Sequence, residues 1–115
     1  MKLKLTINGQ EFSATPEDNA TTQALVRQLP IALRMDELNG NEKYCYLNNA
    51  LPTDAMCPGT ISAGDIMLYG SSCLVVFYDS FPTSYSYTRL GKIDDPSGLA
   101  RAVGSGSVEV TWELA

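Results

Sequence analysis

Apolar and polar residues alternate at the start of the chain. In residues 1–7, MKLKLTI, every second side chain is apolar, which is the period of a strand with one buried face. The pair Asn8–Gly9 readily takes up the positive backbone dihedrals of a tight hairpin turn. Phe12 and Ala14 continue the alternation beyond that turn. The pattern predicts an N-terminal β-hairpin.

The next segment, PEDNATTQALVRQLP, has the pattern of a short helix. Asp18 or Asn19 can cap its first turn. Apolar side chains between Leu25 and Leu29 form one stripe, and Pro30 ends the pattern. A helix of about ten residues is not stable alone in water. We therefore expect it to dock on the rest of the protein.

Three later segments have the pattern of strands. Residues 31–38, IALRMDEL, are followed by an Asn-Gly turn, and residues 66–69, IMLY, follow a Gly-Asp turn. Residues 73–79, CLVVFYD, form a continuous apolar run and are predicted to be a strand buried on both faces. Residues 42–60 contain two prolines and a glycine and are predicted to be loop-rich.

The C-terminal part combines a short helix with a strand. Pro96 marks the start of one or two helical turns, Gly104 lies just past their end, and Asp95 is the expected N-cap. In the tail SVEVTWELA the apolar residues at even positions, from Val108 to Leu114, are predicted to face inward. Trp112 is one of them and is interpreted as a core residue.

Many short strands, frequent turn signals and two short helices are typical of a compact antiparallel β-barrel. A chain of 115 residues has the size of one domain, and no segment resembles a linker. We therefore expect a single, mainly β domain over residues 1–115. Closing the sheet removes its edges, and the helix near residues 20–29 can plug one open end.

Composition narrows the function classes. The net charge is −5, and the eight basic residues are scattered along the chain. Because nucleic-acid binding needs clustered lysine and arginine, we expect no nucleic-acid partner. The N-terminus has no apolar run long enough for a signal peptide or a membrane span. We therefore expect no membrane partner and a cytoplasmic location.

Histidine is absent, and the three cysteines are widely spaced. Without histidine and without a Cys-x-x-Cys motif, the common zinc sites and nucleophile–base pairs cannot be assembled. We therefore expect no metal, no cofactor and no catalytic residue of those kinds. Widely spaced thiols suit a reducing compartment, and Cys73 is interpreted as a small buried apolar residue.

Polar side chains gather in residues 80–95, SFPTSYSYTRLGKIDD. If this segment is a strand, Tyr85, Tyr87 and Arg89 share one face as a stripe roughly 13 Å long. Tyrosine rings beside an arginine suit a peptide segment or a small anionic ligand. The alternative is that the tyrosines pack sideways on the barrel and Arg89 pairs with an acid such as Asp94.

Phe81, Glu42 and Tyr44 complete the candidate ligand site. Phe81 precedes a proline on an extended loop, where it either caps a pocket or shelters the barrel rim. Glu42, Tyr44 and Tyr46 share strand parity in NGNEKYCYL. Glu42 either orients Arg89, acts as a general base if it is buried, or is an ordinary exposed turn residue.

The run LVVFYDSFPTSYSYTRLGKIDDPSGLARAVGSGSVEVTWE, with LNGNEKYCYL, LPTDAMCPGTISAGDIMLYG and DNATTQALVRQLP, resembles a family of small bacterial and archaeal cyclophilin-like fold proteins. The resemblance implies a closed, roughly eight-stranded antiparallel barrel capped by short helices, and it brings no defined activity. Cyclophilins themselves are prolyl isomerases with an FHRV strand, an FMIQGGD segment and a histidine and tryptophan at the proline pocket. This sequence lacks both segments and histidine, so no catalytic residue is carried over.

Three hypotheses follow. The first is a non-catalytic domain that binds a peptide segment or a small anionic ligand. The second is a divergent peptidyl-prolyl isomerase in which Arg89 polarises the amide beside Phe81 and Tyr87. The third is an accessory to a redox or flavin protein, because the chain is acidic and similar proteins can be joined to flavodoxin-like domains.

Overall fold

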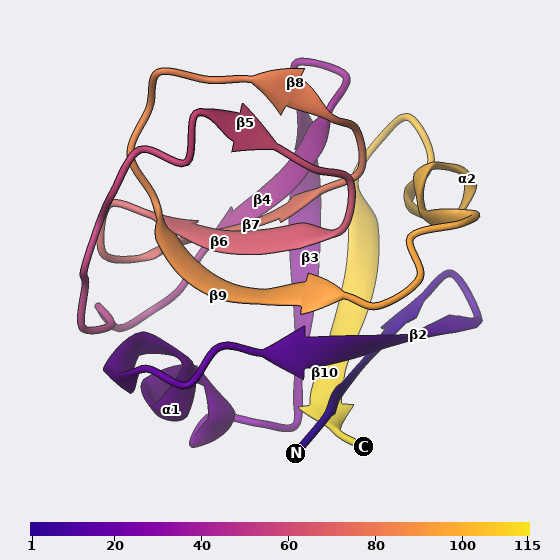
Figure 1. The fold of residues 1–115 in the computed structure, drawn as a ribbon. Helices are drawn as coiled ribbons and strands as arrows, with labels where there is room; N and C mark the ends of the chain where they lie inside the picture. Colours follow the sequence, from indigo (N-terminus) through magenta and orange to yellow (C-terminus); the bar gives the residue numbers. More distant parts are fainter.

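The computed structural model describes residues 1–115 and contains ten strands and two helices (Figure 1). Eight of the strands form a closed barrel in the order β1-β10-β3-β4-β7-β6-β9-β2, and every neighbouring pair is antiparallel. The predicted eight-stranded antiparallel barrel is confirmed. The elements in chain order are β1 (Leu3–Ile7), β2 (Gln10–Pro16), α1 (Ala20–Val26), β3 (Ile31–Leu38), β4 (Glu42–Tyr46), β5 (Thr60–Ile61), β6 (Asp65–Tyr69), β7 (Cys73–Phe77), β8 (Phe81–Pro82), β9 (Thr88–Ile93), α2 (Leu99–Val103) and β10 (Val108–Leu114).

β1 and β2 form the predicted N-terminal hairpin. At its turn, Asn8 and Gly9 have φ angles of 50° and 81°, a left-handed conformation that asparagine and glycine tolerate best. β1 also pairs with the last strand, β10, where Leu5 lies opposite Trp112. This pairing of the first and last strands closes the barrel.

The barrel interior holds a cluster of 21 buried apolar residues. Trp112 is fully buried in this cluster, which confirms its interpretation as a core residue. Leu25 of α1 and Leu99 of α2 belong to the same cluster, and the two helices lie on opposite sides of the barrel (Figure 1). Each helix therefore covers part of the interior. Neither helix is long and apolar enough to cross a membrane.

α1 begins where it was predicted but is shorter. Asn19, rather than Asp18, is the N-cap, and its side-chain oxygen accepts a hydrogen bond from the Thr22 N–H at 2.8 Å. The helix has 7 residues. After it the backbone tightens into a turn, in which the Gln28 N–H bonds to the carbonyl three residues back. Pro30, which cannot donate a backbone hydrogen bond, follows this turn.

Two local predictions are wrong, and one strand was missed. Residues 42–60 are loop-rich, as predicted, but they begin with β4, which pairs with β3 across a turn and with the distant strand β7; pairing with a distant strand leaves little local signal. Asp95 does not cap α2: its carboxylate accepts from the Ser97 N–H at 3.0 Å, and the helix begins only after Gly98. Leu114, predicted to face inward, is 48% exposed because it lies at the end of β10.

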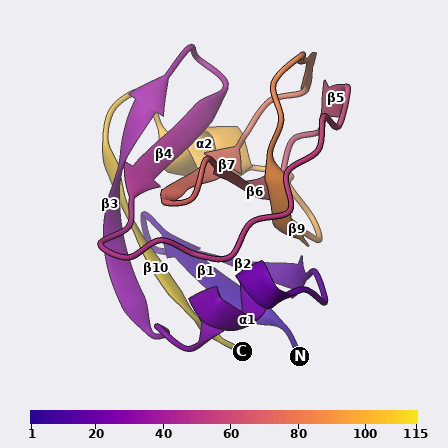
Figure 2. The same cartoon turned by 90° about the vertical axis from the view of Figure 1, so that its left-hand side faces the viewer.

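β5 and β8 form a separate two-stranded sheet outside the barrel. This β5–β8 sheet lies over the outer face of β6 and β7 (Figures 1 and 2). Between them is a second cluster of six buried residues, including Ile61 of β5, Met67 of β6, and Val75 and Phe77 of β7. The alternate residues of β7, such as Leu74, point into the barrel core. β7 is therefore buried on both faces, as its apolar run predicted.

Candidate functional site

The outer face of β4, β7 and β6 carries the candidate site. Residues directly opposite each other on antiparallel strands point to the same face of a sheet. Tyr44 of β4 lies opposite Val75 of β7, which lies opposite Met67 of β6. Glu42 and Tyr46 are two residues from Tyr44 along β4 and share its face. The outward positions of the three strands therefore form one continuous surface.

A cavity of about 580 Å³ lies between this surface, the β5–β8 sheet and the chain that follows β8. We call it the aromatic cavity, because six of its lining residues are tyrosine or phenylalanine. Glu42 is its only carboxylate, and no lysine or arginine lines it. The lining residues are Leu38, Asn39, Asn41, Glu42, Tyr44, Tyr46, Tyr69, Cys73, Val75, Phe81, Pro82, Thr83, Ser84, Tyr85 and Tyr87.

The aromatic rings of the cavity contact one another. The ring centroids of Tyr69 and Tyr87 are 5.6 Å apart, those of Tyr69 and Tyr85 are 6.1 Å apart, and those of Tyr44 and Tyr46 are 6.0 Å apart. These edge-on or tilted arrangements are the favourable ones for aromatic pairs. Tyr87 is buried, whereas Tyr46 and Tyr85 are 71% and 62% exposed. The rim of the cavity therefore offers ring surface to solvent.

Glu42 is the charged group of the cavity. It is only 7% exposed and makes no ion pair. Burial raises its pKa, the like charge of Glu37 raises it further, and no hydrogen bond opposes the rise. Burial also raises the pKa values of Cys73 and Tyr87, to which the nearby Glu42 charge adds. The carboxyl group therefore lies close to the cavity wall without a cation beside it.

Asn41 adds a second acceptor without a partner. Its side-chain Oδ1 atom is buried and accepts no hydrogen bond, and the residue lines the aromatic cavity. Its backbone is fixed: its N–H donates to the Leu38 carbonyl at 3.3 Å and its carbonyl accepts from the Tyr78 N–H at 3.0 Å. A buried polar atom left unpaired costs about 1–3 kcal/mol. Glu42 and Asn41 therefore both line the cavity, and each has a side-chain acceptor that no group of the protein pairs.

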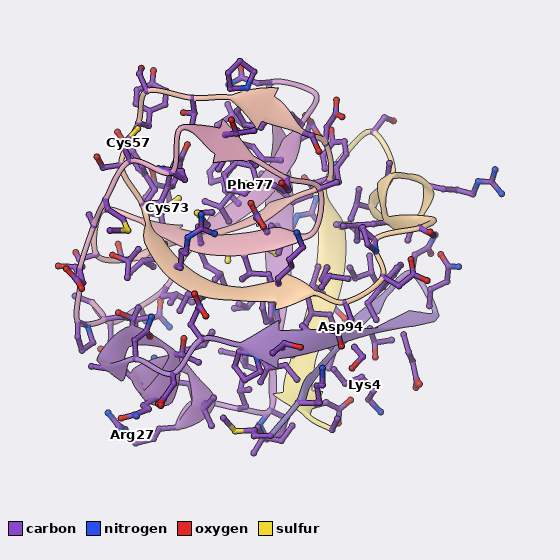
Figure 3. The ribbon with its side chains drawn as sticks, viewed as in Figure 1. Lys4, Arg27, Cys57, Cys73, Phe77 and Asp94 are labelled. Carbon is purple, nitrogen blue, oxygen red and sulfur yellow. The ribbon has the colours of Figure 1, made fainter.

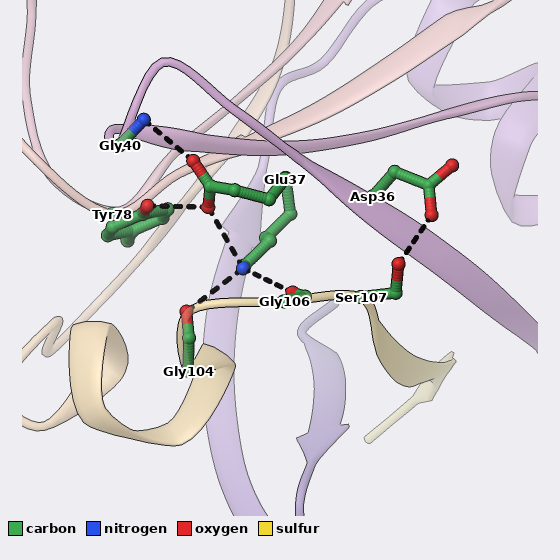
Figure 4. Close-up of polar contacts among 8 residues, drawn as sticks. Asp36, Glu37, Gly40, Tyr78, Gly104, Gly106 and Ser107 are labelled. Carbon is green, nitrogen blue, oxygen red and sulfur yellow. Dashed lines mark hydrogen bonds and ion pairs between the residues drawn. The ribbon is translucent and has the colours of Figure 1, made fainter.

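On the other face of β4, Lys43 points into the barrel and is fully buried. Its ammonium group donates to the carbonyls of Gly104 at 2.9 Å and Gly106 at 2.5 Å, and lies 2.9 Å from a Glu37 carboxylate oxygen. The same oxygen accepts from the Tyr78 hydroxyl at 2.6 Å (Figure 4). We call these contacts the Lys43 network. Burial acts to raise the pKa of Glu37, but its hydrogen bonds outweigh burial and lower the pKa.

The structure brings together five of the six predicted site residues. They come from two separate segments of the chain, β4 and the stretch from β8 to the start of β9. Phe81 also packs into the second buried cluster, where its ring centroid lies 5.7 Å from that of Phe77. The five that line the aromatic cavity are Glu42, Tyr44, Phe81, Tyr85 and Tyr87.

Arg89 lies elsewhere. It lines a second cavity of about 590 Å³, which contains no hydrophobic residue and includes Asp65 and Lys92. The expected Tyr-Tyr-Arg stripe does not form, because β9 begins only at Thr88 and the preceding residues make a single bridge, between Tyr87 and Met56. Arg89 is exposed and makes no ion pair with Asp94 or Asp95. Glu42 does not orient it.

Several residues of the cavity were not among the predicted ligand-site residues. Tyr46 has the same strand parity as Glu42 and Tyr44, so the alternation in EKYCY was the available signal. Tyr69 ends a strand that the pattern did predict, and its position opposite Cys73 places it on the cavity side. Asn41 has no comparable signal, because its role depends on the turn between β3 and β4.

The three cysteines are free and lie in different surroundings. Cys73 is buried at the base of the aromatic cavity, which confirms the prediction of a buried thiol, and Cys57 is exposed on the loop before β5 (Figure 3). Cys45 faces the barrel core. Burial, with smaller contributions from Cys73 and Asp36, raises the pKa of Cys45 to about 11. No group of three cysteine, aspartate or glutamate residues is placed to hold a metal ion.

Comparisons with known proteins agree with this architecture. No curated protein matches the sequence. The solution structure of a hypothetical protein from Archaeoglobus fulgidus is similar, with a TM-score of 0.65 and 17% sequence identity, over 100% of this chain and 95% of that one. A likeness at this identity establishes the fold alone. The sequence profile of the Cyclophilin-like family matches residues 5–113, and the chain therefore belongs to that family.

Proposed function

We propose that this cyclophilin-like domain is a non-catalytic binding module that holds a peptide segment in the aromatic cavity. The observation that carries the proposal is the cavity itself, a concave space of about 580 Å³ with six aromatic residues in its wall. Ligand sites are typically concave, mostly apolar and provided with a few polar groups, with volumes of about 300–1,000 Å³. A space near the middle of that range accommodates one or two side chains of a peptide.

The lining favours a peptide over a small anion. Tyrosine and phenylalanine rings offer flat apolar surface at little cost in side-chain entropy. A bound anion would lie close to Glu42 and would find no lysine or arginine in the wall. The isomerase hypothesis assigned the amide-polarising donor to Arg89, which belongs to the second cavity. Binding without turnover is therefore the function that the geometry supports best.

The proposal is tested by titrating the protein with acetylated and amidated Gly-Gly-X-Gly-Gly peptides while recording its amide NMR spectrum. X is phenylalanine, proline, lysine or glutamate, and an all-glycine peptide is the blank. We expect at least one peptide to shift signals of the cavity residues. Tyr44→Ala removes part of the wall and should weaken that binding on the order of tenfold. Leu114→Ala removes an exposed side chain outside the cavity and should leave it unchanged.

Two results would contradict the proposal. One is the absence of any shift at cavity residues with every peptide at millimolar concentration. The other is catalysis: faster cis–trans exchange of the proline peptide, measured by NMR exchange spectroscopy, that disappears in Arg89→Ala. The second result would assign the protein to the prolyl isomerases instead.

A further inference from the structure

The aromatic cavity contains acceptors and a negative charge but no cation of its own. Glu42 is 7% exposed and unpaired, and the buried Oδ1 atom of Asn41 accepts no hydrogen bond. Both residues line the cavity. A buried carboxylate is costly unless a cation and hydrogen-bond donors satisfy it. The free protein leaves this requirement unmet.

We propose that the cavity binds a primary ammonium group, the lysine side chain of the bound peptide, with Glu42 and Asn41 as acceptors and the tyrosine rings around its methylene stem. The proposal rests on the proposed function and names the chemistry of its ligand. A lysine ammonium has three N–H donors and no acceptor, which matches a carboxylate and an amide oxygen that both lack donors. Aromatic faces attract a cation, and they also pack well on the apolar stem of lysine.

No cation of the chain can take this place in the structure. Lys43 is next to Glu42 in sequence, but it points into the barrel, where Glu37 and two glycine carbonyls engage its ammonium group. Arg89 and Lys92 line the second cavity. No cation lines the cavity, so a cation that pairs with Glu42 there would belong to a ligand.

The protonation of Glu42 supplies a test that needs no mutation. The titratable groups around it are Glu37, Lys43 and Tyr78 on the barrel side and, on the cavity side, Cys73 and the tyrosines of the wall, Tyr44, Tyr46, Tyr69, Tyr85 and Tyr87. The pKa of Glu37 is lowered from 4.5, and the pKa values of Cys73, Tyr78 and Tyr87 are raised from 9.0 or 10.0, so these four shift away from the range in which Glu42 ionises. Because the pKa of Glu42 is raised above 4.5, ammonium affinity should increase with pH as this carboxyl group ionises.

The experiment compares peptides that differ at one side chain. Acetylated and amidated Gly-Gly-X-Gly-Gly peptides with lysine, norleucine, trimethyllysine or glutamate at X are titrated into the protein, with amide NMR shifts of the cavity residues as readout. We expect lysine to bind on the order of tenfold more tightly than norleucine, which lacks the charge. Trimethyllysine, which keeps the charge but has no N–H donor, should bind more weakly than lysine. The n-butylammonium ion shows whether a free amine suffices or a peptide must present it.

A matched pair of variants locates the charge. Glu42→Gln should reduce the affinity for the lysine peptide on the order of tenfold and remove its advantage over norleucine. Glu109→Gln removes the same charge from an exposed position on β10 and should leave both affinities unchanged. If Glu42→Gln does not fold, the wild-type affinity measured from pH 4.5 upward still decides, because only the lysine peptide should gain affinity as Glu42 ionises.

The possible outcomes separate this inference from the proposed function. Equal binding of norleucine and lysine, or tighter binding of trimethyllysine than of lysine, overturns the ammonium site while peptide binding stands. Preference for glutamate overturns it as well. No binding by any peptide removes the proposed function and this inference together. Tight binding of n-butylammonium without any gain from the peptide supports the ammonium site and contradicts a peptide ligand.

Discussion

Two consecutive residues of β4 take opposite charges into opposite surroundings. Lys43 faces the barrel interior, where Glu37 and the carbonyls of Gly104 and Gly106 satisfy its ammonium group. Glu42 faces the aromatic cavity, where no cation or hydrogen bond offsets its burial. The alternation of a strand is sufficient to separate them. One wall of the barrel thus has a charge that is fully paired on one side and a charge that is unpaired on the other.

The partners of a buried charge distinguish a structural role from a functional one. A charge with all its partners inside the protein supports the fold, although removing one partner leaves the others uncompensated. A buried acidic group with no partner inside the protein makes the native state less stable at pH values where the group is ionised. Such a group is expected at sites where a ligand completes the pairing.

Removal of Lys43 should have the largest effect on stability. Lys43→Ala leaves the Glu37 carboxylate and two glycine carbonyls without their cation. Breaking a buried pair in this way costs about 3–5 kcal/mol, which urea denaturation measures directly. Lys92→Ala is the control: this lysine side chain is 56% exposed and 3.9 Å from Asp65, and such surface pairs contribute about 0–1 kcal/mol. Similar losses in both variants would contradict the structural role of the Lys43 network.

Tyr78→Phe should have a smaller effect on the same side of the wall. The change removes only the hydroxyl that donates to Glu37 at 2.6 Å. A hydrogen bond to a charged group contributes about 1.5–3 kcal/mol to the free energy of unfolding. Because Tyr78 is partly exposed, we expect a loss at the lower end of that range. Tyr46→Phe removes a hydroxyl from a ring that is 71% exposed and should unfold at the same urea concentration as the wild type. A wild-type midpoint for Tyr78→Phe would show that the hydroxyl is dispensable.

Glu42→Gln should change stability in the opposite direction. Because burial raises the pKa of Glu42 in the folded state, the native protein holds this proton more tightly than the unfolded chain does. The free energy of unfolding contributed by Glu42 therefore falls as the pH rises from 4.5 through the folded-state pKa. The glutamine variant avoids this loss. It should be more stable than the wild type at pH 7, and the difference should disappear near pH 4. A destabilised variant at pH 7 would mean that the carboxylate has a partner in solution.

The reactivity of the native cysteines compares the cavity face with the barrel face of the wall, because Cys73 lies on the first and Cys45 on the second. Alkylation with iodoacetamide at pH 8, followed by mass spectrometry, should modify the exposed Cys57 first. Cys73 at the cavity base and Cys45 in the barrel are buried and have raised pKa values, so both should react far more slowly, because the thiolate is the reactive form. Cys45, with a pKa of about 11, should be the slowest. If Cys45 reacts before Cys73, the barrel interior is the more accessible side.

The fold was predictable from the sequence wherever the pattern was local. Alternation in the first seven residues, the Asn8–Gly9 turn and the apolar run of β7 each match the structure. β4 was not predicted as a strand, because half of its pairing is with β7, which is distant in sequence, although β3 precedes it across a short turn. The sequence offers two N-cap candidates for α1, Asp18 and Asn19, because both side chains can accept the capping hydrogen bond. Only the backbone geometry identifies Asn19 as the cap.

The candidate site was predictable in part for the same reason. Side-chain type and parity selected Tyr44 and Glu42, and the structure places them in one cavity with Tyr85 and Tyr87. The prediction that Arg89 shares a face with Tyr85 and Tyr87 is wrong. It assumed one continuous strand, whereas β9 begins only at Thr88. The absence of any partner for Glu42 depends on the orientation of every neighbouring charge. No reading of the sequence gives that information.

The distribution of aromatic residues gives the protein two independent optical reporters. Five of the six tyrosines line the aromatic cavity, whereas the single tryptophan, Trp112, is enclosed in the barrel core. Tyrosine emission and near-ultraviolet dichroism therefore follow the cavity, and tryptophan emission follows the barrel. If the β5–β8 sheet detaches before the barrel unfolds, the two signals will change at different denaturant concentrations. A single shared transition would mean that the outer sheet and the barrel unfold as one cooperative unit.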